Sequence, residues 1–120
     1  MAKPPASTIP AARLELYDRL IASLPAVERK GATVPYTSVN GHMFSFLTPA
    51  GSLALRLPTN TRAEFLERYR TTLHEAHGTV MMEYVSVPDD LFADTPAIAP
   101  YLAASFAYVL ALKPKPTTRR

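Results

Sequence analysis

The sequence predicts an α+β fold, in which an antiparallel β-meander of about four to five strands is flanked by three helices. Asn40-Gly41 is the dipeptide most typical of a type I′ hairpin turn, because both central residues of that turn need a positive φ. Residues 48–51 (Thr-Pro-Ala-Gly) carry a second turn signal. The helical patterns lie before and after these turns and do not alternate with the strands, which favours the α+β class.

The two turns separate three short runs, and a longer apolar run follows later. Strands are expected at 34–39, 42–47, 52–58 and 79–87, with a possible short strand at 27–30. With a second turn of four residues, Phe44 faces Leu55 and Phe46 faces Leu53 across the strands. These four side chains and Leu57 would form the face of the sheet that packs on the core.

Apolar residues at spacings of three and four predict the helices. Helices are expected at 9–24, at 61–76, and from about 96 or 100 to 112. Pro10 suits the first turn of the first helix, and Thr61 with Glu64 has the spacing of a capping box. Pro88-Asp89-Asp90 is typical of a short helical turn, with acids where the helix dipole favours them.

The length indicates one domain, at residues 9–112, with flexible ends at 1–8 and 113–120. The chain has 120 residues, which suffices for a core without covalent crosslinks. It has no cysteine, which excludes disulfides, thiolate metal sites and cysteine nucleophiles. The first residues show no apolar signal segment, so a cytoplasmic location is expected.

The positive charge is concentrated at one end. The net charge is +3, and residues 113–120 hold four basic and no acidic side chains. The preceding 112 residues are close to neutral, so nucleic acid is not the expected partner. Residues 95–112 carry no charge, but two prolines and several small residues favour a helix buried in the domain over a membrane span.

The outer face of the predicted sheet is the candidate ligand-binding surface. It would carry Tyr36, Met43 and Arg56 together with small polar residues. Arg offers a planar fork of donors and Tyr a stacking surface, so the three residues could bind an anion or a planar ligand. The alternative is that a helix covers this face and Arg56 reaches its rim.

Two further groups of residues are candidates for chemistry. His74 and His77 would lie near the end of a helix and could bind zinc with His42 or Glu83 as a third ligand, although the spacing is not that of a zinc protease. Exposed polar residues that finish a helix are the favoured interpretation. Glu83 in an apolar strand could have a raised pKa and act as an acid or base. It is expected instead to pair with Arg56 or with an arginine of the second helix, or to lie at an exposed edge. No catalytic residue, metal ligand or cofactor is predicted.

Three segments resemble the TfoX N-terminal domain family, in its stand-alone single-domain form. They are residues 36–46 (Tyr-Thr-Ser-Val-Asn-Gly-His-Met-Phe-Ser-Phe), 51–57 (Gly-Ser-Leu-Ala-Leu-Arg-Leu) and 82–91 (Met-Glu-Tyr-Val-Ser-Val-Pro-Asp-Asp-Leu). The resemblance covers about residues 14–116 and implies a bacterial domain with a curved antiparallel sheet flanked by helices. It implies no catalytic residues.

The sequence therefore favours a non-enzymatic module that works through a protein partner or by self-association. A homodimer is one form that such self-association could take. The alternative is a module that binds a small ligand or a metal on the outer sheet face. The resemblance does not extend to the helical second domain of the family's competence regulators, so their regulatory role cannot be inferred from it.

Overall fold

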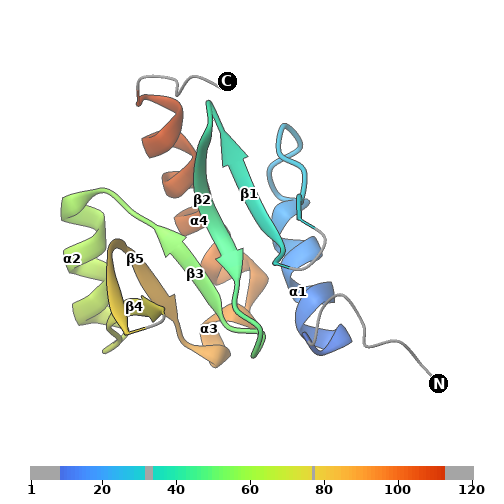
Figure 1. Cartoon of the computed structure of the whole chain (residues 1–120), viewed down its shortest axis with the longest axis horizontal. Helices are drawn as coiled ribbons and strands as arrows, with labels where there is room; N and C mark the ends of the chain where they lie inside the picture. The colour runs from blue at the N-terminus through green and yellow to red at the C-terminus, as the bar shows by residue number, and fades with distance from the viewer. Residues whose placement is uncertain (1–8, 32–33, 77, 113–120) are drawn as a thin grey trace.

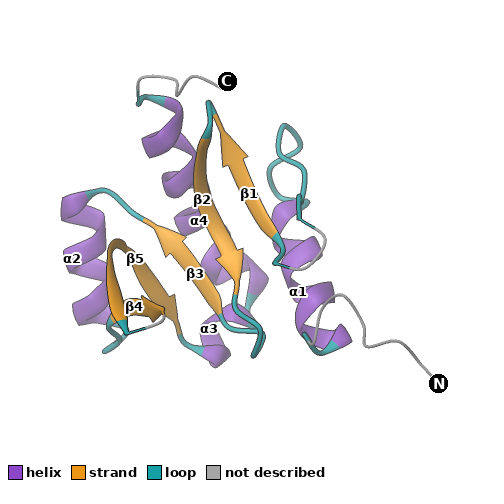
Figure 2. Ribbon diagram, in the orientation of Figure 1, coloured by secondary structure: helices purple, strands orange, loops and turns teal. Residues whose placement is uncertain are grey.

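The computed structural model describes residues 9–31, 34–76 and 78–112. The ends predicted to be flexible, 1–8 and 113–120, lie outside these ranges. The described chain forms an α+β fold, as predicted (Figures 1 and 2). Its helices are α1 (Ala11–Ile21), α2 (Thr59–Arg68), α3 (Asp89–Phe92) and α4 (Thr95–Leu110). Its strands are β1 (Tyr36–Val39), β2 (His42–Leu47), β3 (Leu53–Arg56), β4 (Leu73–Ala76) and β5 (Thr79–Val87).

All five strands form one antiparallel sheet in the order β1-β2-β3-β5-β4. The predicted meander comprises strands β1 to β3. The hairpin β4–β5 completes the sheet, and β5 pairs with β3. Asn40 and Gly41 have φ of 57° and 81°, as the predicted type I′ turn requires. Lys30 forms an isolated bridge with Tyr36 where a further strand was considered possible.

The main core lies between one face of the sheet and the helices. Figure 1 shows α4 behind the sheet, where it packs against β1, β2 and β3 as well as against α1. Side chains from all four helices join this core. Its largest fully buried members are Tyr17, Phe44, Phe65, Phe92, Leu20, Leu47, Leu53, Leu55, Leu57, Ile98, Leu102 and Val85.

Helix α4 begins at Thr95. Asp94 is its N-cap residue, and the Asp94 carboxylate accepts the Ala97 N–H at 3.4 Å. Pro100 lies inside this helix and does not end it. The uncharged segment thus packs within the domain, as expected. No helix in the described ranges is long and apolar enough to cross a bilayer.

The predicted strand register is wrong by one residue. Leu53 lies opposite Leu47, Leu55 opposite Ser45, and Phe46 opposite Ala54. The turn is the cause. Thr48 N–H donates to the Ser52 carbonyl at 2.8 Å, which leaves a three-residue loop and not one of four.

Gly51 makes this shorter loop possible. Its φ is +89°, and a Cβ there would lie 2.8 Å from Cγ of Arg13 in α1. The loop therefore requires glycine both for its backbone conformation and for the close approach of α1.

The shifted register moves Phe46 to the face opposite the helices and brings Ser45 into the core. Phe44 stays in the core because β2 has a bulge: Thr37 pairs with Ser45, but Ser38 pairs with Met43. The Phe44 ring contacts Phe106 of α4 edge-on, with centroids 5.7 Å apart.

The buried hydroxyl of Ser45 forms hydrogen bonds with two other buried hydroxyls. Its Oγ lies 2.7 Å from the Tyr17 hydroxyl of α1 and 2.5 Å from Oγ1 of Thr37 in β1. All three residues are fully buried. Burial raises the pKa of the Tyr17 hydroxyl, so it stays protonated and can donate.

The predicted helix 61–76 is wrong in its second half. The helix begins two residues earlier, at Thr59, and ends at Arg68. Arg70 has φ +52°, and the Thr71 N–H donates to the Leu66 carbonyl at 3.1 Å, which is the bond of a Schellman ending. The chain then continues as strand β4, so His74 lies on a strand.

Candidate functional site

The sheet curls strongly away from the helices. Strands β3 and β5 lie between β2, which carries Phe46, and β4, which carries His74. In a flat sheet the backbones of β2 and β4 would therefore be about 14 Å apart. The rings of Phe46 and His74 instead meet edge-on, with centroids 5.1 Å apart and planes at 77°. The face opposite the helices is therefore concave.

This concave face carries a small apolar cluster of its own. Phe46, Ala54 and Tyr84 form it, and the partly buried Tyr36, Met43 and Met81 pack against them. No helical residue among those described belongs to the cluster. The second apolar layer of the molecule thus consists of side chains from the strands.

An open pocket of about 400 Å³ lies where the sheet curls over. It is lined by Val34, Phe46, Leu47, Thr48, Pro49, His74 and Glu75. Val34 lies before β1, Phe46 and Leu47 belong to β2, and His74 and Glu75 belong to the edge strand β4, so segments far apart in the sequence line one pocket. Its size is within the range of small-molecule sites, and its lining is mostly apolar.

The structure brings together two of the three predicted ligand-binding residues. Tyr36 and Met43 both pack on the concave cluster. Arg56 begins on the same stretch of sheet, opposite Tyr84, but its guanidinium turns to Glu83. Of the residues described around the pocket, none is Tyr36, Met43 or Arg56, so their role in binding stays a prediction.

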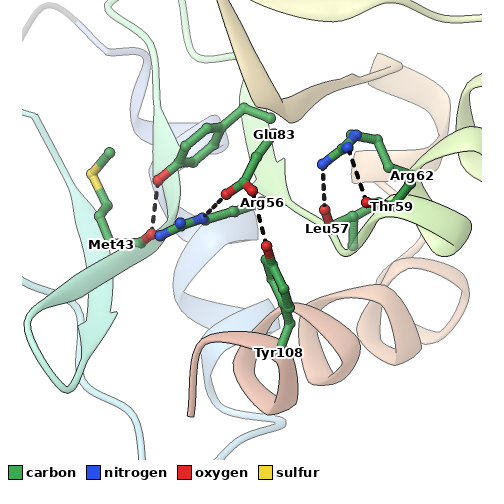
Figure 3. Close-up of polar contacts among 8 residues, drawn as sticks. Met43, Arg56, Leu57, Thr59, Arg62, Glu83 and Tyr108 are labelled. Carbon is green, nitrogen blue, oxygen red and sulfur yellow. Dashed lines mark hydrogen bonds and ion pairs between the residues drawn. The ribbon is translucent and has the colours of Figure 1, made fainter. Parts of the chain in front are cut away.

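Arg56 belongs to a polar network between the sheet and α4 (Figure 3). Its Nε donates to Oε1 of Glu83 at 2.6 Å, and the Tyr108 hydroxyl donates to Oε2 at 2.9 Å. The guanidinium also lies over the Tyr108 ring, 5.7 Å from its centroid. The predicted pairing of Glu83 with Arg56 is confirmed.

The network keeps Glu83 ionised. Burial by itself would raise the pKa of the Glu83 carboxyl, but the hydrogen bonds from Arg56 and Tyr108 and the nearby positive charges lower it below its usual value. The carboxylate and the guanidinium therefore satisfy each other, and the arrangement is that of a structural ion pair.

Tyr84 connects the cluster to the hairpin β1–β2 by a hydrogen bond. Its hydroxyl donates to the Met43 carbonyl at 2.7 Å, the contact drawn beside Arg56 in Figure 3. Burial raises the pKa of Tyr84 to about 12, which keeps this donor protonated.

The two histidines considered for zinc have different outcomes. His74 lies on β4, where burial lowers its pKa and favours the neutral imidazole. His77 lies outside the described residues. Within those ranges, no three side chains of His, Asp or Glu are placed to hold a metal ion together.

Phe46 and His74 are the pocket residues that the sequence interpretation placed elsewhere. Phe46 was assigned to the core face and His74 to a helix end. A hairpin signal for His74 lies in residues 71–80, where two threonines begin the segment and Gly78 is followed by the β-branched Thr79 and Val80.

Comparison with known proteins identifies no relative. No family model, no curated protein and no solved structure matches the chain. The resemblance to the TfoX N-terminal domain therefore stays a prediction.

Proposed function

We propose that this chain is a binding module that takes a small, largely apolar ligand on the concave face of its sheet. The observation that carries the proposal is the pocket of about 400 Å³ that Phe46 and His74 form where the sheet curls over. Side chains of this kind supply apolar and aromatic contact area, and ligand sites are commonly lined in this way.

Methionine methyl groups can report on binding. Met43 and Met81 do not line the pocket, but both pack against the concave cluster that contains the pocket residue Phe46, whereas Met82 is 68% exposed and belongs neither to this cluster nor to the main core. We therefore expect a library of small aromatic compounds to shift the methyl signals of Met43 and Met81 in the ¹³C-methyl NMR spectrum. A ligand at 100 times its Kd should also add about 2.7 kcal/mol to the free energy of unfolding.

A pair of tryptophan variants makes the test specific. Val34 lines the pocket and is 43% exposed, and Leu110 at the end of α4 is 48% exposed and does not line it. Val34→Trp should obstruct the pocket and abolish the shifts, and Leu110→Trp should leave them unchanged. Binding that survives Val34→Trp, or a library without hits, would contradict the proposal.

The second candidate is a protein-interaction or regulatory module, as the TfoX-like segments favour. One observation supports it: Val80 and Met82, both on β5, expose 46% and 68% of their surface. A homodimer through this hairpin, in a cytoplasmic setting, is the simplest form. Sedimentation equilibrium should then show a dimer that Met82→Glu dissociates; a monomer at high concentration would exclude self-association.

A further inference from the structure

The formal charge of the described pocket lining is negative. Among the described lining residues, Glu75 carries a formal charge and no lysine or arginine is present. His74 is shifted towards its neutral form. An occupied pocket would therefore present a negative charge at the rim of an apolar surface.

The polar groups of the lining differ in what they still offer a ligand. Oγ1 of Thr48 already accepts the Ser52 N–H at 3.0 Å within the turn. The His74 imidazole and the Glu75 carboxylate form no hydrogen bond or ion pair with any other residue in the described ranges. Both are acceptors that a ligand can use, since neutral histidine keeps one unprotonated nitrogen.

The aromatic part of the pocket has a defined geometry. Phe46 is 7% exposed, and the edge-on contact with His74 holds both rings at a large angle to each other. Because the Phe46 ring is almost fully buried, a flat ring in the pocket would contact the partly buried His74 imidazole more than the Phe46 ring. Leu47 also lines the pocket, but its side chain is fully buried in the main core.

We propose that the ligand of this pocket is a small molecule with a flat apolar body and one protonated amine. The body lies against the His74 imidazole beside Phe46, and the ammonium faces the Glu75 carboxylate. This assignment rests on the proposed function and adds the charge of the ligand to it. Because Glu75 is exposed, the ion pair contributes selectivity more than affinity.

Three indole compounds of matched shape test the assignment on the full chain. Tryptamine is a cation, tryptophol is neutral and indole-3-acetate is an anion. Calorimetric titration should rank them in this order, with tryptamine about three- to fivefold tighter than tryptophol, as expected for an exposed ion pair. Salt should reduce this preference.

Two matched variants isolate the carboxylate. Glu75→Gln should remove the difference between tryptamine and tryptophol while tryptophol binds as before. Glu67→Gln, at an exposed position of α2 that does not line the pocket, should preserve the order. Far-UV circular dichroism checks that both variants are folded.

The outcomes separate the two proposals. Equal binding of the three compounds, or tightest binding of indole-3-acetate, with the Met43 and Met81 signals shifted, would overturn the cationic ligand and leave the binding module standing. A peptide with lysine or arginine that outcompetes tryptamine would overturn the small-molecule occupant. If none of the compounds in this set or in the wider aromatic library shifts these methyl signals, both proposals fail.

Discussion

The helix-facing side of the sheet buries Phe44, Leu53 and Leu55 almost completely under α1 and α4, whereas the concave side buries Phe46 and Tyr84 with strand residues alone. One strand, β2, supplies a phenylalanine to each side. The helices therefore account for the large core, while the curl of the sheet creates a second, smaller apolar layer that remains open at one end as a pocket.

The largest expected effect contrasts the two phenylalanines of β2. Phe44→Ala should lower the free energy of unfolding by about 3–5 kcal/mol, because the closed core retains a cavity. Phe46→Ala should cost less, because water can enter from the adjoining pocket. Urea denaturation of both variants measures the difference. Equal losses would mean that the concave layer is packed as tightly as the core.

The next effect concerns the hydroxyls under α1. Ser45→Ala removes the shared partner of Tyr17 and Thr37 and should cost about 1–3 kcal/mol, because it leaves the buried Tyr17 hydroxyl unsatisfied. Ser38→Ala, which loses an exposed contact with Lys30, is the control and should change stability by less than about 0.5 kcal/mol. Similar losses in chemical denaturation would contradict this account of the core.

A smaller effect is expected on the concave side. Tyr84→Phe removes the hydrogen bond to the Met43 carbonyl and should cost about 0.5–1.5 kcal/mol. Tyr36→Phe is the matched change on the same face, since its hydroxyl has no hydrogen-bond partner in the described ranges. A thermal-denaturation comparison that shows no difference between the two would argue against this bond.

The smallest expected effect is a pH dependence of stability that comes from the ion pair between Glu83 and Arg56. Because the folded-state pKa of Glu83 lies below its ordinary 4.5, its pairing stabilises the fold above about pH 4.5. That contribution is lost as the pH falls through the folded-state pKa. Glu83→Gln should therefore reduce the loss of Tm between pH 5 and pH 3.

A control keeps this last test specific. Glu75→Gln changes a carboxylate without an ion-pair partner in the described ranges, so its Tm should follow the wild-type curve. If Glu83→Gln and the wild type lose Tm in parallel below pH 4.5, the ion pair with Arg56 does not stabilise the fold.

Local patterns predicted most of the framework. The Asn40-Gly41 turn, α1, the helical turn after Pro88 and the pairing of Glu83 with Arg56 follow from backbone preferences, hydrophobic periodicity and charge. Each depends on residues close in sequence or on a pair with few alternatives. The α+β class follows from their order.

Helix α2 shows where local patterns fail. The segment 69–76 carries helix-compatible residues, so periodicity favoured a continuous helix. The left-handed Arg70 and the pairing of β4 with β5 override that preference, because the ladder satisfies backbone groups that a frayed helix end would leave to water.

Local sequence patterns thus suffice for the fold class, the first hairpin and the positions of the helices, apart from the end of α2. The face on which each side chain of β2 lies depends on tertiary contacts, since a loop of three residues that ends at Gly51, and not one of four, inverts the alternation and a bulge restores Phe44 to the core. Tertiary structure also decided the concave pocket, because the curl that joins Phe46 to His74 is a property of the whole sheet.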